Sequence, residues 1–373
     1  MAKGNVIKHF SPAWFAAIMG TGGFANVLYM LGNHWSFGHI LGIAVAWLNA
    51  LMFLLFIVPW VARWFLHFET LKQDLQHPVM SNFFVTMPVG AMIVGTNASL
   101  MGTKFLGQSL VYSVSLVSWL IGITGALILG VYAGYNMMRT EQTPPQMMNF
   151  AWLISPVASI AVPLIGNPLV QMLKANNIAA AKTVLLISLS FFGVGFFLFL
   201  FIGGIIFNRL AVHPLPPAAM TPTFWITLGP VGVGAITLMG LADSAKAVGL
   251  MSSIDTAYLL AAILWGMGIW ALGIALVITW NNLKHGGIPF SLSWWAFIFP
   301  LSAYTMASLK LSAYFGSGIA YGYSILLTIL LAFLWIITLA RTAAGAFSGK
   351  IFTPHPQPGP AGGERFPKGN ATE

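Results

Sequence analysis

The sequence predicts an all-α integral membrane protein with ten transmembrane helices, organised as five helical hairpins. Three observations support this fold class. Of the 373 residues, 58% are hydrophobic and only 6% are charged, whereas a soluble domain carries about 25% charged residues. Apolar segments long enough to cross a bilayer, which takes about 20 residues, follow one another with short breaks. Every second segment is also interrupted by proline or glycine at a recurring position.

The apolar segments indicate one membrane domain, residues 1–343, followed by a tail. The expected spans are residues 10–31, 39–66, 80–101, 110–138, 148–173, 183–209, 222–242, 254–281, 290–310 and 317–342. Residues 344–373 are rich in proline and glycine. We therefore expect a disordered cytoplasmic tail over these residues.

The odd-numbered spans share an aromatic pair that is followed five or six residues later by a helix breaker. The pairs are Trp14-Phe15, Phe83-Phe84, Phe150 with Trp152, Phe224-Trp225 and Trp294-Trp295, and their first members are 69, 67, 74 and 70 residues apart. The breakers are Gly20, Pro88, Pro156, Pro230 and Pro300. A proline inside a helix removes a backbone hydrogen bond and bends the helix. A pattern with a fixed period indicates a repeated structural unit, here a broken helix followed by a smooth one.

The even-numbered spans are smoother, and Pro59 near the end of the second is their one proline. Because each unit holds two spans, all five broken helices run in the same direction, unlike the inverted repeats of many transporters. Five parallel hairpins can close into a quasi-fivefold ring with the broken helices inside and the smooth ones facing lipid. In a membrane, backbone groups freed at a break must be buried in protein or line a wet cavity. We therefore expect a central pore.

Basic residues are distributed unevenly between the two ends of the spans. Eleven Lys and Arg lie on the side of the N-terminus and five on the other side. Positive residues favour the cytoplasmic side. The sequence therefore predicts a multi-pass protein of the cell membrane with both termini in the cytoplasm.

Composition also argues against several functions. The chain has no cysteine, and its few acidic residues and histidines lie in loops, at span ends or in the tail. Proton pumps and cation pores usually carry acidic groups or histidine inside the membrane, and no catalytic motif is present. We expect no enzyme activity, no cofactor and no metal. The formal net charge of +9 is not gathered into a cluster that would bind nucleic acid, and it favours small anions as partners.

The broken spans carry hydroxyl and amide groups that could line the pore. A bare anion costs tens of kcal/mol to place in hydrocarbon, so a pathway must offer hydrogen-bond donors or water. The candidates are Thr21, Asn26, Thr86, Asn97, Ser155, Ser159, Thr227, Ser302 and Thr305. The alternative for each is hydrogen bonding between helices, which uses the same residue types.

Four broken spans end in a lysine on the side opposite the termini: Lys104, Lys174, Lys246 and Lys310. At the mouth of a pore, each would attract an anion about 10 Å away by about 0.4 kcal/mol in water. The alternative is snorkelling of lysine at the membrane surface, and the two roles are compatible.

Phe299 immediately precedes Pro300 in the ninth span, where a bend could place its ring across the pore axis. An apolar ring closes an ion pathway by excluding water. The alternative is that Phe299 packs between two helices.

Two motifs resemble the tellurite-resistance/dicarboxylate transporter family of the voltage-dependent anion channel superfamily. They are Phe10-Ser-Pro-Ala-Trp-Phe-Ala-Ala-Ile-Met-Gly-Thr-Gly22 and Trp294-Trp-Ala-Phe-Ile-Phe-Pro300, with a weaker match at Gly229-Pro-Val-Gly232. The family includes bacterial tellurite-resistance channels, plant slow anion channels, malate permeases and sulfite pumps. The resemblance implies five hairpins around a pore, a homotrimer with one pore per subunit, and a gating phenylalanine at the position of Phe299.

Two modes of transport remain open from the sequence. The first is a channel or uniporter for small anions such as C4-dicarboxylates (malate, for example), sulfite, chloride or nitrate. The second is a proton-coupled dicarboxylate symporter or exporter with alternating access.

Overall fold

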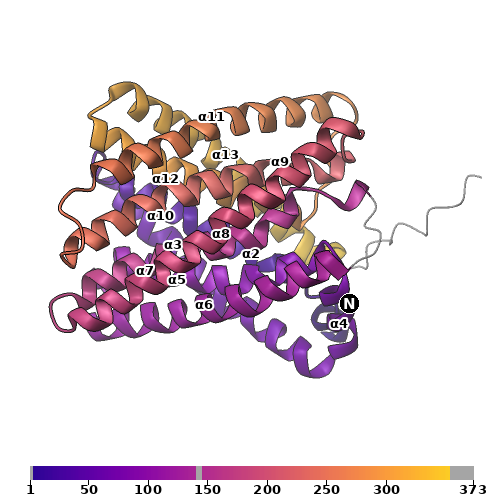
Figure 1. Cartoon of the computed structure of the whole chain (residues 1–373). Helices are drawn as coiled ribbons and strands as arrows, with labels where there is room; N and C mark the ends of the chain where they lie inside the picture. Colours follow the sequence, from indigo (N-terminus) through magenta and orange to yellow (C-terminus); the bar gives the residue numbers. More distant parts are fainter. Residues whose placement is uncertain (1–2, 140–144, 353–373) are drawn as a thin grey trace, which may run out of the picture.

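The computed structural model describes residues 3–139 and 145–352, in which helices are joined by short loops and no strand is present (Figure 1). In this part of the chain, nine helical segments are long and apolar enough to cross a membrane. They are Pro12–Leu31, Phe37–Leu66, Met80–Lys104, Gln108–Arg139, Phe150–Leu173, Ile178–Val212, Ala218–Ala247, Asp255–Lys284 and Gly318–Ser348. The chain is therefore an all-α membrane protein.

The ninth sequence-predicted span is helical but is not one of these nine. It comprises the 3₁₀ segment η8 (Leu292–Phe297) and the helix α12 (Ile298–Phe315). Serine, threonine and lysine side chains, among them Ser302, Thr305 and Lys310, make it less apolar than the others. It is nevertheless buried over most of its length, so protein surrounds it on most sides.

Five helices carry most of the buried residues and five carry few. The inner helices are α2 (Phe15–Leu31), α5 (Thr86–Met101), α7 (Ile154–Leu173), α10 (Leu228–Ala247) and α12. The outer helices are α3 (Phe37–Leu66), α6 (Gln108–Arg139), α8 (Ile178–Val212), α11 (Asp255–Lys284) and α13 (Gly318–Ser348). Within their most apolar stretches, 61–89% of residues are buried in the first four inner helices, against 17–28% in the outer ones. The shorter helices are α1 (Lys3–Lys8), α4 (Phe68–Gln76) and α9 (Thr221–Phe224).

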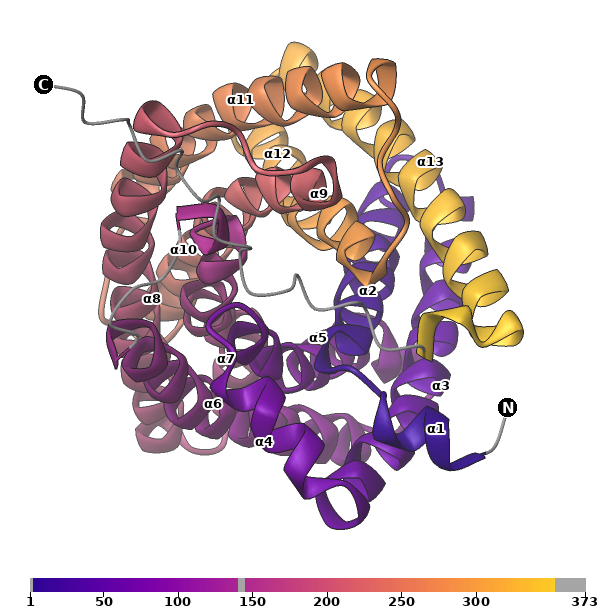
Figure 2. The ribbon, with the colours of Figure 1, turned by 90° about the vertical axis from the view of Figure 1, so that its right-hand side faces the viewer.

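The contacts between inner helices form a closed cycle. Helix α2 contacts α5, α5 contacts α7, α7 contacts α10, α10 contacts α12, and α12 contacts α2. Figure 2 shows these helices surrounding the centre of the molecule, with the outer helices around them. Each outer helix packs on its own inner helix and on the next one: α3 on α2 and α5, for example, and α13 on α12 and α2. Each hairpin therefore repeats the same set of contacts.

Each inner helix is preceded by a short 3₁₀ segment. These are η1 (Pro12–Trp14), η2 (Met80–Val85), η5 (Phe150–Leu153), η7 (Trp225–Thr227) and η8. They too contact one another in cyclic order, from η1 through η2, η5, η7 and η8 back to η1. All five inner helices therefore start at the same end of the molecule and run in the same direction, as the hairpin period predicts.

The sequence-predicted prolines stand at the change from 3₁₀ to α-helix rather than in the middle of a helix. Pro88, Pro156, Pro230 and Pro300 are each the third residue of their α-helix. Backbone N–H groups in a first turn have few helical partners, so a proline is tolerated there. The prediction of a break at Gly20 is wrong, since α2 continues through it. A Cβ at Gly20 would lie 2.9 Å from Trp295 Cε3 and 3.0 Å from Ile298 Cβ, so this glycine allows η8 and the start of α12 to pack closely.

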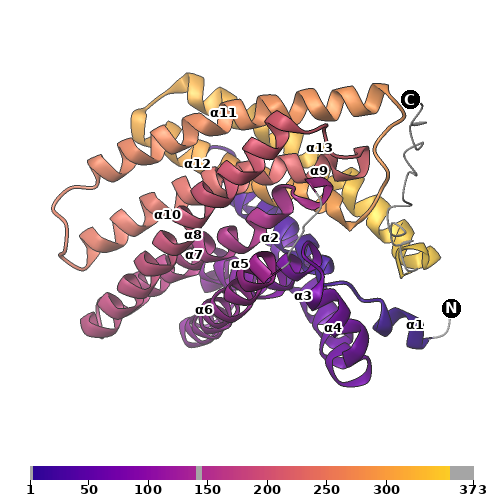
Figure 3. The ribbon, with the colours of Figure 1, turned by 45° about the vertical axis from the view of Figure 1, so that its right-hand side comes forward.

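The two ends of the described chain meet at the end where the 3₁₀ segments lie (Figure 3). The ring of Phe352, in η9 (Lys350–Phe352), stacks on the ring of Trp14 with centroids 5.5 Å apart. The predicted tail boundary at residue 344 is therefore too early, because α13 continues to Ser348 and η9 packs on η1. Residues 353–373 of the predicted tail lie outside the described residues.

Candidate functional site

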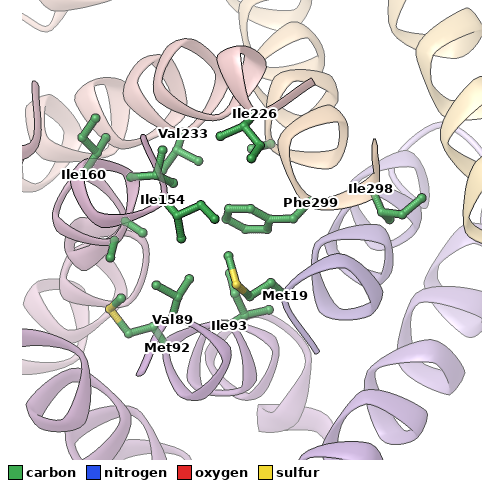
Figure 4. Packing of buried hydrophobic residues seen from close by; sticks show 14 of the residues in the cluster. Met19, Val89, Met92, Ile93, Ile154, Ile160, Ile226, Val233, Ile298 and Phe299 are labelled. Carbon is green, nitrogen blue, oxygen red and sulfur yellow. The ribbon is translucent and has the colours of Figure 1, made fainter. Parts of the chain in front are cut away.

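Apolar side chains from all five hairpins converge at the centre of the molecule. Figure 4 shows the ring of Phe299 extending from α12 toward Ile154 of α7, with further side chains around it. The labelled neighbours on the other elements include Met19 of α2, Val89 of α5, Ile226 of η7 and Val233 of α10. All of them are buried, and Phe299 is 4% exposed. We call Phe299, Met19, Val89, Ile154, Ile226 and Val233 the central cluster.

The local structure of α12 determines the direction of the Phe299 side chain. Phe299 is the second residue of α12, two residues after the 3₁₀ segment ends at Phe297 and directly before Pro300. Its carbonyl accepts a hydrogen bond from Ser302 Oγ at 2.7 Å. A Cβ placed on Gly23 of α2 would lie 3.8 Å from Phe299 Cδ2. The ring therefore leaves α12 beside the glycine-containing face of α2.

Several hydroxyl candidates bond back to their own helix. Thr305 donates to Leu301 O at 2.7 Å, and Thr227 donates to Phe224 O at 2.7 Å. Thr86 Oγ1 lies 2.7 Å from Pro12 O and 2.6 Å from Phe83 O, so it joins η1 to the start of α5. Such bonds satisfy the hydroxyl inside the protein. These residues stabilise the helix starts and interfaces whether or not they also face a pathway.

Two other candidates bond to neighbouring elements. Thr21 accepts a hydrogen bond from Trp335 Nε1 of α13 at 3.1 Å, which directs its hydroxyl toward an outer helix. Ser155 donates to Asn82 Oδ1 of η2 at 3.0 Å and so connects α7 to the neighbouring hairpin. Ser159 is buried and its hydroxyl has no hydrogen-bond partner within residues 3–139 and 145–352. Among the nine polar candidates, the Ser159 hydroxyl is therefore available to bind water or an anion, and so is Asn26 Nδ2, a buried donor without a partner in the described residues.

Asn26 and Asn97 belong to a buried amide cluster together with Asn49, which sequence reasoning did not identify. Asn97 Nδ2 donates to Asn26 Oδ1 at 2.8 Å and to Gly22 O at 3.0 Å, while Asn97 Oδ1 accepts from Asn49 Nδ2 at 3.0 Å. The cluster connects α2, α3 and α5. Asn49 had a sequence signal, because it is an amide in the middle of an otherwise apolar outer span.

The four lysines lie at the end opposite the 3₁₀ segments but differ in their surroundings. Lys104 Nζ lies 5.7 Å from the centroid of the Tyr29 ring, and Lys174 Nζ donates to Gln171 Oε1 at 2.8 Å. Lys246 is exposed. Lys310 forms an ion pair with Asp243, which has its other oxygen within hydrogen-bond distance of the Tyr258 hydroxyl. Its charge is therefore largely compensated, which the sequence prediction missed.

Asp243 is the one acidic residue in the described inner helices, and these helices carry no histidine. Asp243 lies four residues before Ala247, where α10 ends. Within the described residues, no three side chains of the types that ligate metals come together. The central cluster consequently lies in a stretch of apolar and neutral polar groups.

A partly buried ion pair fixes the N-terminal segment at the other end of the molecule. Arg63 of α3 donates through Nη2 to Asp74 Oδ2 of α4 at 2.7 Å, and through Nε and Nη1 to the carbonyls of Lys8 and Phe10.

His77 lies between α4 and η2. Its Nδ1 accepts hydrogen bonds from the backbone N–H groups of Val79 and Met80, both at 3.2 Å, and caps η2.

The family model SLAC1, described as voltage-dependent anion channel, matches residues 9–343 of this chain. The chain belongs to this family. The match covers both motifs, so the family resemblance predicted from them is confirmed.

Relatives of the chain are named as transporters and resemble it over most of their length. An uncharacterized transporter of Methanocaldococcus jannaschii is 31% identical over 354 residues, which are 95% of this chain and 98% of the relative. A sulfite efflux pump of Arthroderma otae is 27% identical over 358 residues, 93% of each chain. A malic acid transport protein of Schizosaccharomyces pombe is 20% identical over 370 residues, 95% of this chain and 84% of the relative. The chain is thus a member of an anion-transporting family.

Proposed function

We propose that this member of the voltage-dependent anion channel family conducts small anions through a central pathway closed by Phe299. In this proposal the ten helices form a quasi-fivefold ring of transmembrane helices, with the pathway along its axis. The closed cycles of contacts among the inner helices and among the 3₁₀ segments support this arrangement. The observation that carries the proposal is the central cluster, to which each of the five hairpins contributes an apolar side chain.

The central cluster has the properties of a hydrophobic constriction. An anion loses its hydration in an apolar passage, at a cost far above thermal energy, and a narrow apolar passage also expels water. The ring of Phe299 reaches across the centre and its neighbours are aliphatic or thioether groups. Displacement of this one ring is therefore the smallest change that would open the pathway.

The proposed path has basic residues at one end and includes a neutral polar group of α7. Lys104, Lys174 and Lys246 would raise the local anion concentration at the mouth. Ser159, four residues after Ser155 on α7, offers a hydroxyl that no described protein group occupies. A neutral donor binds an anion weakly enough to release it, as conduction requires.

The substrate class proposed is a small anion: a C4-dicarboxylate such as malate, sulfite, or chloride and nitrate. The names of the relatives include a sulfite efflux pump and malic acid transport proteins. The excess of basic over acidic residues, 16 against 7, fits anionic cargo. Following the distribution of Lys and Arg, we place the protein in the cell membrane with both termini cytoplasmic. We also propose a homotrimer, which the family resemblance implies.

The second candidate is a proton-coupled symporter or exporter for dicarboxylates with alternating access. The name of the sulfite efflux pump favours it, because a pump moves its substrate uphill. Such coupling needs a group that binds the proton. In the described inner helices, Asp243 is the one carboxylate, and it is held by Lys310 near the end of α10.

Vesicles containing the purified full-length chain distinguish the two functions. A channel gives a current that reverses at the Nernst potential of the anion at every pH gradient, tested with malate, sulfite, chloride and nitrate in turn. Uphill uptake driven by a pH gradient alone would contradict the channel and support the coupled transporter. Vesicles without protein and vesicles with a heat-inactivated sample are the controls.

A further inference from the structure

The structure has a second feature, separate from the proposed pathway, on the face that the outer helices present to lipid. A groove of about 480 Å³ lies between α3 and α6, and α5 forms its floor. Its walls include Trp47 and Leu54 of α3 and Val117 of α6, whose side chains are 54–64% exposed. The groove is therefore open on the side of the bilayer.

The groove has the length of one leaflet. On α3 its wall runs from Ile43 to Leu54, which is about 17 Å at 1.5 Å per residue. Half of a hydrocarbon core about 30 Å thick is about 15 Å. The groove starts at Phe105 and Leu106, beyond the end of α5, and so belongs to the half of the bilayer on the lysine side.

The lining favours an apolar occupant over water or an ion. Most lining residues are aliphatic or aromatic, and two of the three polar ones already have partners. Asn97 is engaged in the amide cluster, and Ser113 donates to Ser109 O at 2.9 Å. An acyl chain satisfies such a surface, since it needs no hydrogen bond and gains dispersion contacts along its length.

A lysine lies next in sequence to lining residues at one end of the groove. Lys104 lies in the 3₁₀ turn η3 (Gly102–Lys104), between Gly102 and Phe105, which both line the groove. Its side chain is exposed and its ammonium is near no carboxylate among the described residues. A lysine at the level of the headgroups attracts anionic lipid by about 1 kcal/mol.

We propose that this groove binds one acyl chain of an anionic phospholipid, with the headgroup on Lys104. Helix α5, which forms the floor of the groove, also contributes to the central cluster on its opposite side. Ala91 and Val94 face the groove, whereas Val89 lies in the central cluster. A bound chain supports α5 from behind and stabilises the packing of the inner helices.

The test measures lipid retained by the full-length protein. The protein is reconstituted in an equal mixture of phosphatidylglycerol and phosphatidylcholine, re-extracted in mild detergent, and its bound lipid is counted by native mass spectrometry. We expect retained phosphatidylglycerol in the wild type and its loss in Ala50→Phe, which fills the groove. The matched control is Ala44→Phe, on the same helix and exposed but outside the groove, which should retain the lipid.

A second pair of variants tests the headgroup. Lys104→Gln should lower the preference for phosphatidylglycerol about fivefold, as one basic residue at an anionic surface does, and Lys174→Gln should leave it unchanged. Equal retention of the two lipids by the wild type, or unchanged retention in Ala50→Phe, overturns the proposal. Because the chain has no native cysteine, cross-linking between copies through Leu54→Cys would instead show that a second subunit covers the groove. None of these readouts depends on anion flux, so they separate this site from the proposed function.

Discussion

Lys310 Nζ of α12 lies 2.6 Å from Asp243 Oδ2 of α10, and this ion pair joins the last two hairpins near the lysine end of the molecule. The Tyr258 hydroxyl of α11 donates to the same carboxylate. The pair carries almost no net charge, so Lys310 adds little to the positive potential at this end. The arrangement is asymmetric, although the hairpins that carry it repeat.

We expect Asp243→Asn to increase anion flux at low ionic strength. The change adds one net positive charge, worth about 0.4 kcal/mol at 10 Å in water and so about a twofold gain, while asparagine still accepts from Tyr258. The gain should vanish at high salt because of screening. Flux in vesicles at two salt concentrations is the measurement, and the double variant Lys310→Gln with Asp243→Asn should behave as wild type. A loss of flux at both concentrations would mean that Asp243 acts through structure alone.

Phe299→Ala should raise the conductance, because it removes the ring at the centre of the apolar cluster and admits water. The matched control is Phe297→Ala, two residues earlier in η8. The Phe297 ring is equally buried but packs on Trp225 and Trp294, with centroids 5.3 and 5.7 Å away, outside the central cluster. Both variants lose buried apolar volume, at about 3–5 kcal/mol for a large aromatic residue, and only the first should conduct more. Currents are compared at equal protein per vesicle. Equal effects of the two variants would remove Phe299 from the gating role.

Gly232→Ala should lower the stability of the protein by about 1–3 kcal/mol, the range for overpacking a tight interface. A Cβ at this position in α10 would lie 2.5 Å from the backbone nitrogen of Tyr304 in α12, and backbone atoms cannot turn aside. Gly266→Ala on α11 is the control, since a Cβ there meets nothing within 4 Å. The measurement is the thermal unfolding midpoint of the purified protein in detergent. If Gly232→Ala is as stable as the control, the close contact of α10 and α12 is not required.

Stability should fall as the pH drops below about 6.5, the ordinary pKa of histidine. Burial lowers the pKa of His77, against the opposing effect of Asp74, so the folded state keeps this imidazole neutral while the unfolded state takes up a proton. The stabilisation that the neutral His77 provides is complete above the pKa of the unfolded state, and it is lost as the pH falls toward the pKa of the folded state. Protonation would also place a proton on the nitrogen that accepts from Val79 and Met80.

His77→Asn tests this prediction, because an asparagine side chain can accept from the same backbone groups and does not titrate. Its unfolding midpoint should depend less on pH than that of the wild type between pH 5 and pH 7, a window on either side of about 6.5. Burial and the neighbouring Lys8 and Arg63 also lower the pKa of His9, so His9→Asn should remove part of the remaining slope. An unchanged slope in His77→Asn would rule out a role for this cap.

Some residue roles could be predicted because their neighbours are fixed by the repeat. The recurrence of an aromatic pair and a proline indicated which helices lie inside. In the structure the aromatic pairs lie at the 3₁₀ segments before α5, α7, α10 and α12, and the prolines lie in the first turns of these helices. Gly20 did not follow this rule. A glycine can mark a break or a close contact, and only the presence of Trp295 beside it decides between the two.

The direction of polar side chains could not be predicted in the same way. Thr21 accepts a hydrogen bond from Trp335 of α13, and Thr305 donates to a carbonyl of its own helix. Neither partner follows from the residue type, which suits a pore and a helix contact equally. The rotation of each helix about its axis is set by packing on two neighbours, which a single span does not encode. The same limit hid Asn49, whose partner Asn97 is 48 residues away, and Asp243, which is 67 residues from Lys310.

The sequence by itself determined that the chain is helical, lies in a membrane and repeats a hairpin five times, because the bilayer imposes length and apolarity on each span separately. Only the tertiary structure decided which side chains meet at the centre, which lysine is paired with a carboxylate, and where a groove opens toward lipid. Those features depend on contacts between spans far apart in the chain, and such contacts exist only once the helices have packed.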